Sequence, residues 1–197
     1  MHSRAWAALP VMAVAVLCGC ASAPRREVPS AAPPAWLSEP AVWRVRQVVL
    51  IELGELQFPV QGLLELDTAA GTVRLAALDD FGVTLFRLTI TRTGESVDFI
   101  LPLVPRGAEV TRSVAASLRR IYLEPWLTAP GREGIFLEAG TDGTIASASP
   151  RGGGAWRVWY DDYGDAAGVP VPRSIRYMER GGASLKITQE SVKRVDK

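Results

Sequence analysis

The chain has 197 residues, with 22 basic and 21 acidic side chains, two cysteines and one histidine. The histidine, His2, and one cysteine, Cys18, lie in an apolar N-terminal segment, so the rest of the chain lacks the side chains of a Ser-His-Asp or Cys-His nucleophile, a thiolate zinc site or a disulfide. A net charge near zero without a basic run also argues against nucleic acid, because phosphates require clustered lysine and arginine.

Residues 1–19 have the pattern of an export signal. Arg4 precedes an apolar run over 5–17, which is too short to cross a hydrocarbon core of ~30 Å as a helix. The run ends in Leu17-Cys18-Gly19-Cys20, which resembles a lipobox, the cleavage site of bacterial lipoprotein precursors. This resemblance implies that cleavage follows Gly19 and that acylated Cys20 anchors the mature chain to a membrane facing the periplasm. The alternative is an ordinary signal peptide with a small-residue cleavage site.

The residues after Cys20 predict a tether followed by one domain. Ala21 stands where sorting rules for such lipoproteins place the aspartate of proteins retained at the inner membrane, so we expect the outer membrane. Residues 20–35 are rich in Pro, Ala and Ser and are typical of an extended, solvated tether. The remaining residues, 36–197, are enough for one domain with its own core and too few for two ordinary ones.

The first part of this domain has the pattern of an antiparallel meander. Residues 43–53 mix Val, Leu and Ile with polar side chains in partial alternation, which predicts a long strand. More strands are expected at hairpin spacing, separated by turn residues. They cover residues 62–67, 72–78, 84–91 and 96–101.

The hydrophobic period then changes and predicts an amphipathic helix over about 109–122. Its apolar positions recur at helical spacing at Val110, Val114, Leu118, Ile121 and Tyr122. Arg112, Arg119 and Arg120 fall on the other side, and Pro125 and Pro130 are expected to end the helix. Strands are expected to resume near residues 134–138, 144–148, 156–160, 173–179 and 184–188.

Alternate positions of these strands are apolar, so one face of the sheet is expected to be strongly hydrophobic. Such a face, covered by the helix, forms either a filled core or a hollow that holds acyl chains, and composition alone does not choose between them. The candidate acyl-chain-binding residues are Leu64, Leu66, Leu75, Phe86, Leu88, Ile90, Phe99 and Leu101 of the sheet, with Val114 and Leu118 of the helix.

Two segments resemble the LolB family of outer-membrane lipoprotein receptors. Residues 78–88 are similar to that family's loop between two central strands, and residues 156–163, with 171–173 and 181–188, are similar to its closing hairpin. The resemblance implies a mainly β fold with a helical lid (α+β), in which a curved antiparallel sheet forms an incomplete barrel, as in the periplasmic carrier LolA. It also implies a monomer without cofactor or catalysis, which receives lipoproteins or another lipid from a LolA-like carrier and inserts them into the membrane.

The resemblance assigns membrane insertion to the loop that carries Phe81 and Gly82. A large apolar residue beside Asp79, Asp80 and Gly82 stands where turns are normally polar, and an exposed phenylalanine there would need an apolar partner such as lipid. The alternative is an aromatic side chain buried in the turn.

Other functional interpretations remain open. The adjacent acidic pairs, at 79–80 and 161–162, are typical of solvated turns, although paired carboxylates also bind Ca²⁺ or act as acid and base. The tryptophans at 36, 43, 126, 156 and 159 indicate core packing or a membrane-facing rim, with a sugar platform as the alternative. The alternative to a lipid receptor is a non-catalytic accessory lipoprotein that docks in an envelope complex. A carboxylate hydrolase would need two carboxyl groups converging in one pocket.

Overall fold

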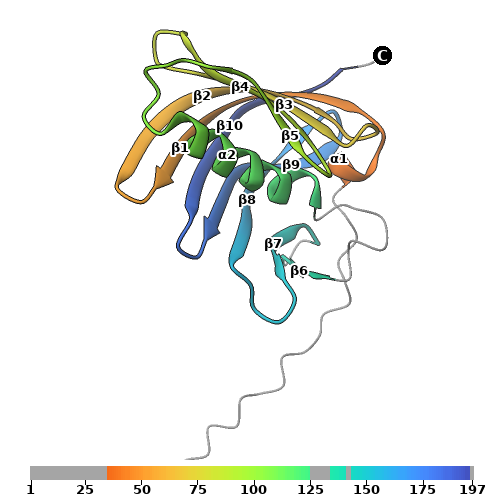
Figure 1. Ribbon diagram of the computed structural model, residues 1–197. Coiled ribbons are helices and arrows are strands. Elements are labelled where there is room, and N and C mark those ends of the chain that lie inside the picture. The colour runs from red at the N-terminus through yellow and green to blue at the C-terminus, as the bar shows by residue number, and fades with distance from the viewer. Residues whose placement is uncertain (1–34, 125–133, 141–142, 196–197) are drawn as a thin grey trace, which may run out of the picture.

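A computed structural model describes residues 35–124, 134–140 and 143–195 (Figure 1). The expected signal peptide, the lipidation site Cys20 and all of the tether except Ala35 lie outside the described residues. Pro125, Trp126 and Pro130, which follow the predicted helix, also lie outside them.

The described residues form one antiparallel sheet of ten strands, in the order β5-β4-β3-β2-β1-β10-β9-β8-β7-β6, and two helices. The chain meanders outward from the central strand β1 to the edge strand β5, crosses the sheet through α2, and returns from the other edge, β6, to β10, which pairs with β1. The strands are β1 (Val42–Leu53), β2 (Leu56–Asp67), β3 (Thr72–Leu78), β4 (Thr84–Thr91), β5 (Glu95–Ile100), β6 (Ile135–Ala139), β7 (Ile145–Pro150), β8 (Trp156–Ala166), β9 (Val169–Glu179) and β10 (Ala183–Val195). The helices are α1 (Ala35–Ser38) and α2 (Gly107–Tyr122).

The sheet curves around α2, which lies across one of its faces (Figure 1). We call the face that packs against α2 the inner face and the opposite one the outer face. The alternation of buried and exposed residues along most of β1 and β2 follows from the period of two, which turns successive side chains to opposite faces. Most inward side chains are apolar, with Gln47 as an exception. The apolar stripe of α2 meets the inner face, and Val110, Leu118 and Ile121 are fully buried there. The predicted architecture, an open curved sheet under a helical lid, is confirmed.

Local patterns predict most element boundaries closely, but three strands are longer than expected: β8 ends at Ala166 rather than near residue 160, β9 begins at Val169 rather than near residue 173, and β10 ends at Val195 rather than near residue 188. β3 and β4 have the expected bounds, and α2 begins two residues before the expected start. β2 begins at Leu56 rather than near residue 62, and includes Pro59. This proline is tolerated because β3 pairs only with residues 61–67, so at Pro59 the strand has β1 on one side and no described neighbour on the other.

Candidate functional site

Eight of the ten predicted acyl-chain-binding residues lie together on the inner face or on the side of α2 that covers it. They are Leu64, Leu66, Leu75, Phe86, Leu88, Ile90, Val114 and Leu118, and each is at most 6% exposed. All eight belong to one continuous hydrophobic cluster. These side chains are therefore covered by one another and by the other members of the cluster.

The other two predicted residues, Phe99 and Leu101, lie elsewhere. Phe99 pairs with Arg87 on the outer face, where the guanidinium carbon lies 5.8 Å from the centre of its ring. The expected alternation fails because the register of β4 and β5 shifts between Arg87 and Leu88, and the inner position is taken by Ile100. Leu101 follows the end of β5, is half-buried, and donates its backbone N–H to the carbonyl oxygen of Leu85 at 2.7 Å.

Polar contacts attach the C-terminal turn of α2 to both halves of the sheet. On the β4–β5 side, Nε of Arg119 donates to the carbonyl oxygen of Thr91 at 3.0 Å, and the same guanidinium forms an ion pair with Glu95. On the β9 side, Arg120 forms an ion pair with Glu179 at 2.7 Å. All these charged side chains are less than one-third exposed, so the contacts are shielded from solvent more than ordinary surface pairs.

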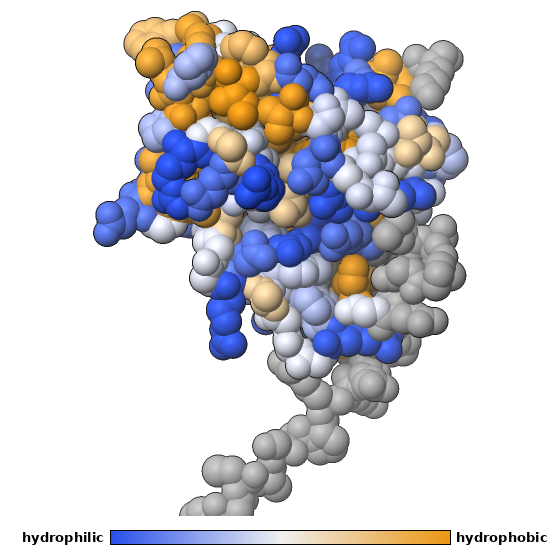
Figure 2. All heavy atoms as spheres, in the orientation of Figure 1, coloured by the Kyte–Doolittle hydropathy of each residue, from blue (hydrophilic) through white to orange (hydrophobic). Residues whose placement is uncertain are grey.

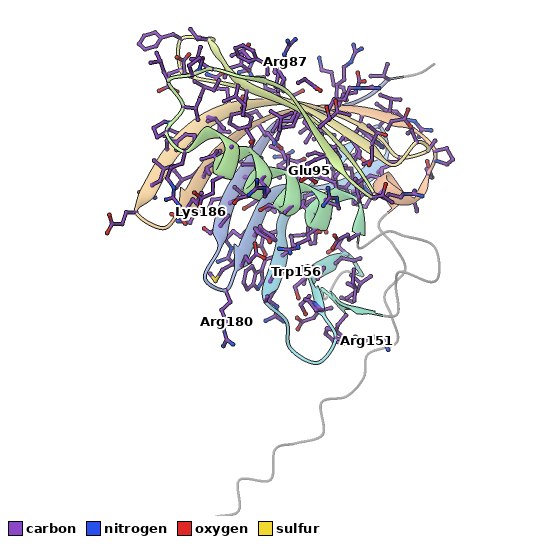
Figure 3. The ribbon with its side chains drawn as sticks, in the orientation of Figure 1. Arg87, Glu95, Arg151, Trp156, Arg180 and Lys186 are labelled. Atoms are coloured by element: carbon purple, nitrogen blue, oxygen red, sulfur yellow. The ribbon has the colours of Figure 1, made fainter. Side chains whose placement is uncertain are left out.

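Aromatic side chains surround the Arg120 contact. The guanidinium lies 5.7 Å from the ring centre of Trp156 and donates to the hydroxyl of Tyr177. Burial raises the pKa of Tyr177 to about 12. Tyr160, which is also buried, donates its hydroxyl to the carbonyl oxygen of Ile121 at 2.8 Å and so satisfies one of the free carbonyls at the helix end. Figure 3 labels Glu95 and Trp156, which belong to the two sides of this attachment.

A small polar cluster lies in the core where α2 ends. Gln189 donates from Nε2 to the hydroxyl of Tyr122 at 3.2 Å, and that hydroxyl donates to Oε1 of Gln47 over the same distance. All three side chains are buried, and burial raises the pKa of the Tyr122 hydroxyl above its ordinary range. Sequence reasoning missed this cluster because Gln47, Tyr122 and Gln189 come from three distant elements. The one available signal was a glutamine at an inward position of the first strand.

The loop between β3 and β4 presents Phe81 to solvent with 91% of its surface exposed. Asp79 fixes the loop because its Oδ1 accepts hydrogen bonds from the backbone N–H groups of Phe81, at 2.9 Å, and Val83, at 2.8 Å. Gly82 has φ of +81°, a left-handed conformation that glycine adopts without steric cost. The loop is therefore a defined turn that holds an apolar side chain in water, and the alternative of a buried aromatic residue is wrong.

A second loop, which joins β5 to α2, lies beside the first and adds to its apolar surface. The two loops are joined where Leu101 bonds to Leu85, two residues beyond Val83. Leu103, in the second loop, is 84% exposed and Val83 is 49% exposed. Figure 2 shows hydrophobic side chains gathered at the corner of the molecule that holds these loops in Figure 1. We call Phe81, Val83 and Leu103 the apolar tip.

The acidic pairs have local roles in the structure. Asp79 holds the loop described above, and Asp161 lies 3.7 Å from Arg176 on the surface. Within the described ranges, no three His, Cys, Asp or Glu side chains are grouped so that they hold a metal ion. The described helices are also too short or too polar to cross a membrane.

Comparison with solved structures identifies the fold. A LolA superfamily protein from Nitrosomonas europaea superposes with a TM-score of 0.50 at 8% identity, covering 84% of this chain and 96% of that one. An outer membrane lipoprotein-sorting protein domain, so named in its crystal structure from Vibrio parahaemolyticus, gives 0.47 at 10% identity, covering 79% of this chain and 86% of that one. A DUF1329 family protein from Desulfovibrio piger gives 0.40 at 9% identity, covering 81% and 88%.

No protein-family profile and no curated protein sequence matches the chain. The assignment of fold rests on the first superposition, which covers nearly the whole of the Nitrosomonas protein. The chain has the LolA-like fold, as its resemblance to the LolB family implies.

Proposed function

We propose that this protein is a non-enzymatic lipoprotein of the outer membrane that binds acyl chains beneath α2 and passes lipoproteins or another lipid to the membrane, in the manner of LolB. The proposal is supported chiefly by the way in which α2 packs over the apolar inner face. Among the described residues, one long helix, α2, covers the apolar surface of β3, β4, β5 and β10 on a sheet whose two edges, β5 and β6, do not pair with each other. The short helix α1 adds Trp36 and Leu37 to the same cluster. Displacement of α2 therefore opens the part of the interior that it covers.

The energetics of such a transfer are those of an exchange. An acyl chain loses roughly 0.8 kcal/mol of stabilisation for each methylene that leaves an apolar environment, so a carrier must keep the chain out of water at every stage. The inner face supplies apolar contacts when Val114 and Leu118 of α2 move away from Leu88 and its neighbours. Because one apolar contact replaces another, the exchange is nearly isoenergetic and requires no nucleotide.

The apolar tip supports the delivery step. Phe81 and Leu103 are held away from the core by two adjacent loops, and the hydrogen bonds of Asp79 keep the first loop in its exposed conformation. Burying a phenylalanine side chain contributes about 1.5–3 kcal/mol, so the tip gains free energy by entering a bilayer. In this proposal the acylated Cys20 keeps the domain at the membrane while the tip enters it.

Uptake of a fluorescent acyl probe tests the binding step. The double variant Arg119→Gln, Arg120→Gln removes the ion pairs that attach α2 to β5 and β9. Hydrogen bonds to charged groups contribute about 1.5–3 kcal/mol each, so we expect uptake to be at least about tenfold faster than in the wild type. Arg112→Gln is the matched control, because Arg112 is exposed on the same helix and has no ion pair among the described residues. A wild-type protein that takes up no probe, or a double variant that behaves like the control, contradicts the proposal.

A second candidate function is docking in an envelope complex without lipid carriage. The observation that favours it is the close packing of the inner face, where the eight predicted lining residues already form one cluster. Under this function the double variant loses thermal stability and still takes up no probe. Circular dichroism of the same samples verifies that the fold is intact in either case.

A further inference from the structure

A trough of about 1080 Å³ crosses the outer face of the sheet, on the side away from α2. Its lining comes from β10, β1, β2, β3, β4 and β5, and none of its residues belongs to the loops of the apolar tip. The register of the strands places its side chains in two rows. The row nearer the tip runs through Arg46, Leu63, Ala76 and Arg87, and the next row runs through Lys193, Arg44, Glu65, Arg74 and Thr89.

The middle of the first row is apolar and its ends are basic. Leu63 is 49% exposed and lies beside Ala76, with Arg46 on one side and Arg87 on the other. Arg46 and Arg87 stand on strands separated by β2 and β3, which corresponds to about 14 Å between strand axes. This surface combines contact for an aliphatic group with guanidinium groups that bind phosphate or carboxylate in a bidentate manner.

The charges of the trough do not balance. Five basic side chains line it, against the three acidic ones of Glu65, Asp98 and Glu190. Glu65 is shared by two arginines, Arg44 at 3.4 Å and Arg74 at 2.9 Å. A third arginine, Arg46, is paired with Glu190 at 2.7 Å.

The third carboxylate, Asp98, accepts hydrogen bonds from two hydroxyl groups. Ser96 donates to one of its oxygens at 2.7 Å and Thr89 to the other at 2.9 Å, and these bonds lower the pKa of Asp98. Among the described residues, neither Arg87 nor Lys193 forms an ion pair. Arg87 packs over the ring of Phe99, and its charge contributes to lowering the pKa of Asp98. Both side chains are exposed and contribute positive charge at the two ends of the trough.

The same hairpin joins this charged surface to the apolar tip. β3 carries Arg74 and Ala76, β4 carries Arg87, and the loop between these strands carries Phe81. Figure 3 shows Arg87 on the upper side of the sheet, at the opposite end of the molecule from Arg151 and Arg180. An apolar tip beside a basic, partly apolar surface matches a bilayer interface, where hydrocarbon lies next to anionic headgroups.

We propose that the outer-face trough binds the anionic headgroups of membrane lipids, with phosphate on Arg87 and Lys193 and the upper part of an acyl chain on Leu63 and Ala76. The trough thereby orients the domain on the bilayer with the apolar tip toward the hydrocarbon. The side chains proposed to bind lipid here differ from those proposed beneath α2. The trough also borders Leu64, Leu75 and Leu88, but these side chains are buried on the inner face.

Vesicle co-sedimentation tests the site with the mature chain, residues 20–197, carrying Cys20→Ala so that no acyl anchor contributes. All described helices and strands lie within this chain. Binding is compared between vesicles of phosphatidylcholine alone and vesicles that also contain phosphatidylglycerol. Each basic side chain near an anionic surface raises affinity roughly fivefold, so Arg87→Gln, Lys193→Gln is expected to weaken binding to the anionic vesicles roughly 30-fold.

The matched control is Arg151→Gln, Arg180→Gln, which also removes two exposed charges that have no ion pair among the described residues. We expect it to change the affinity less than twofold, because charges more than a screening length of ~10 Å from the membrane contribute little. Equal loss in both variants, or equal binding to the two kinds of vesicle, overturns the proposal. Uptake of the acyl probe, measured on the same variants, stays unchanged if only the trough is affected.

Discussion

The replacement Phe81→Glu separates delivery from folding and from cargo binding. Phe81 is 91% exposed and its side chain does not belong to the hydrophobic core. The free energy of unfolding of the variant should therefore lie within about 0.5 kcal/mol of the wild-type value. In the hydrogen bonds that define the loop, backbone N–H groups of Phe81 and Val83 donate to Asp79, so the altered side chain is not involved. The loop should therefore keep its shape.

The expected defect follows from the transfer of the side chain into lipid. A buried phenylalanine contributes about 1.5–3 kcal/mol, which corresponds to roughly a ten- to hundredfold change in rate or affinity, and a carboxylate at the same depth opposes insertion further. The assay is transfer of a fluorescent acyl cargo from the protein to liposomes. We expect transfer to be slowed at least tenfold while cargo binding is unchanged.

Met178→Glu is the matched control for this prediction. Met178 is 56% exposed on β9, which lies outside the two loops of the tip, and its replacement introduces the same charge. Equal transfer by the Phe81 variant and the wild type removes Phe81 from the mechanism. A defect of the same size in both variants shows that net charge, rather than the tip, controls transfer.

Three further predictions concern the anchor, the loop and pH. Cys20→Ser should abolish fatty-acid labelling of the chain in cells, since the thiol is the group that forms the thioether; label in the variant refutes the assignment of a lipoprotein. Gly82→Ala should lower stability by about 1 kcal/mol and slow transfer, because φ of +81° is strained for alanine; an unchanged melting temperature contradicts this reasoning. Burial raises the pKa values of Tyr122, Tyr160 and Tyr177 above the ordinary value of 10.0, to about 12 for Tyr177, so stability should be full below pH 10.0 and fall as pH rises beyond it. Thermal melts above pH 10.0 test whether stability falls as pH rises. A melting temperature that stays constant or rises over this range would contradict the prediction.

The fold was largely predictable from local patterns. The period of two in 72–78 and 84–91 gives β3 and β4 directly, and the helical spacing of Val110, Val114 and Leu118 gives α2. The packing of α2 against the sheet follows because the helix and the sheet each have one apolar face. These features depend on residues close in sequence, which is why sequence alone is sufficient for them.

Features that depend on the register of distant strands were not predictable. The shift between Arg87 and Leu88 moves Phe99 to the outer face, and no residue type in the sequence marks it. The outer-face trough requires the alignment of six strands. In the sequence, its arginines therefore look like the exposed polar positions of ordinary strands. The ion pairs of Arg119 and Arg120 join α2 to Glu95 and Glu179, which lie 24 and 59 residues away along the chain.

The position of a bound acyl chain tests most directly whether the protein carries lipid beneath α2. A fatty acid with a photoreactive group along its chain is bound to the mature protein, activated by light, and mapped by mass spectrometry of the peptides. We expect modification of the inner face, at residues such as Phe86, Leu88, Val114 and Leu118. Modification confined to the apolar tip or to the outer face, with the inner residues unmodified, would contradict this expectation.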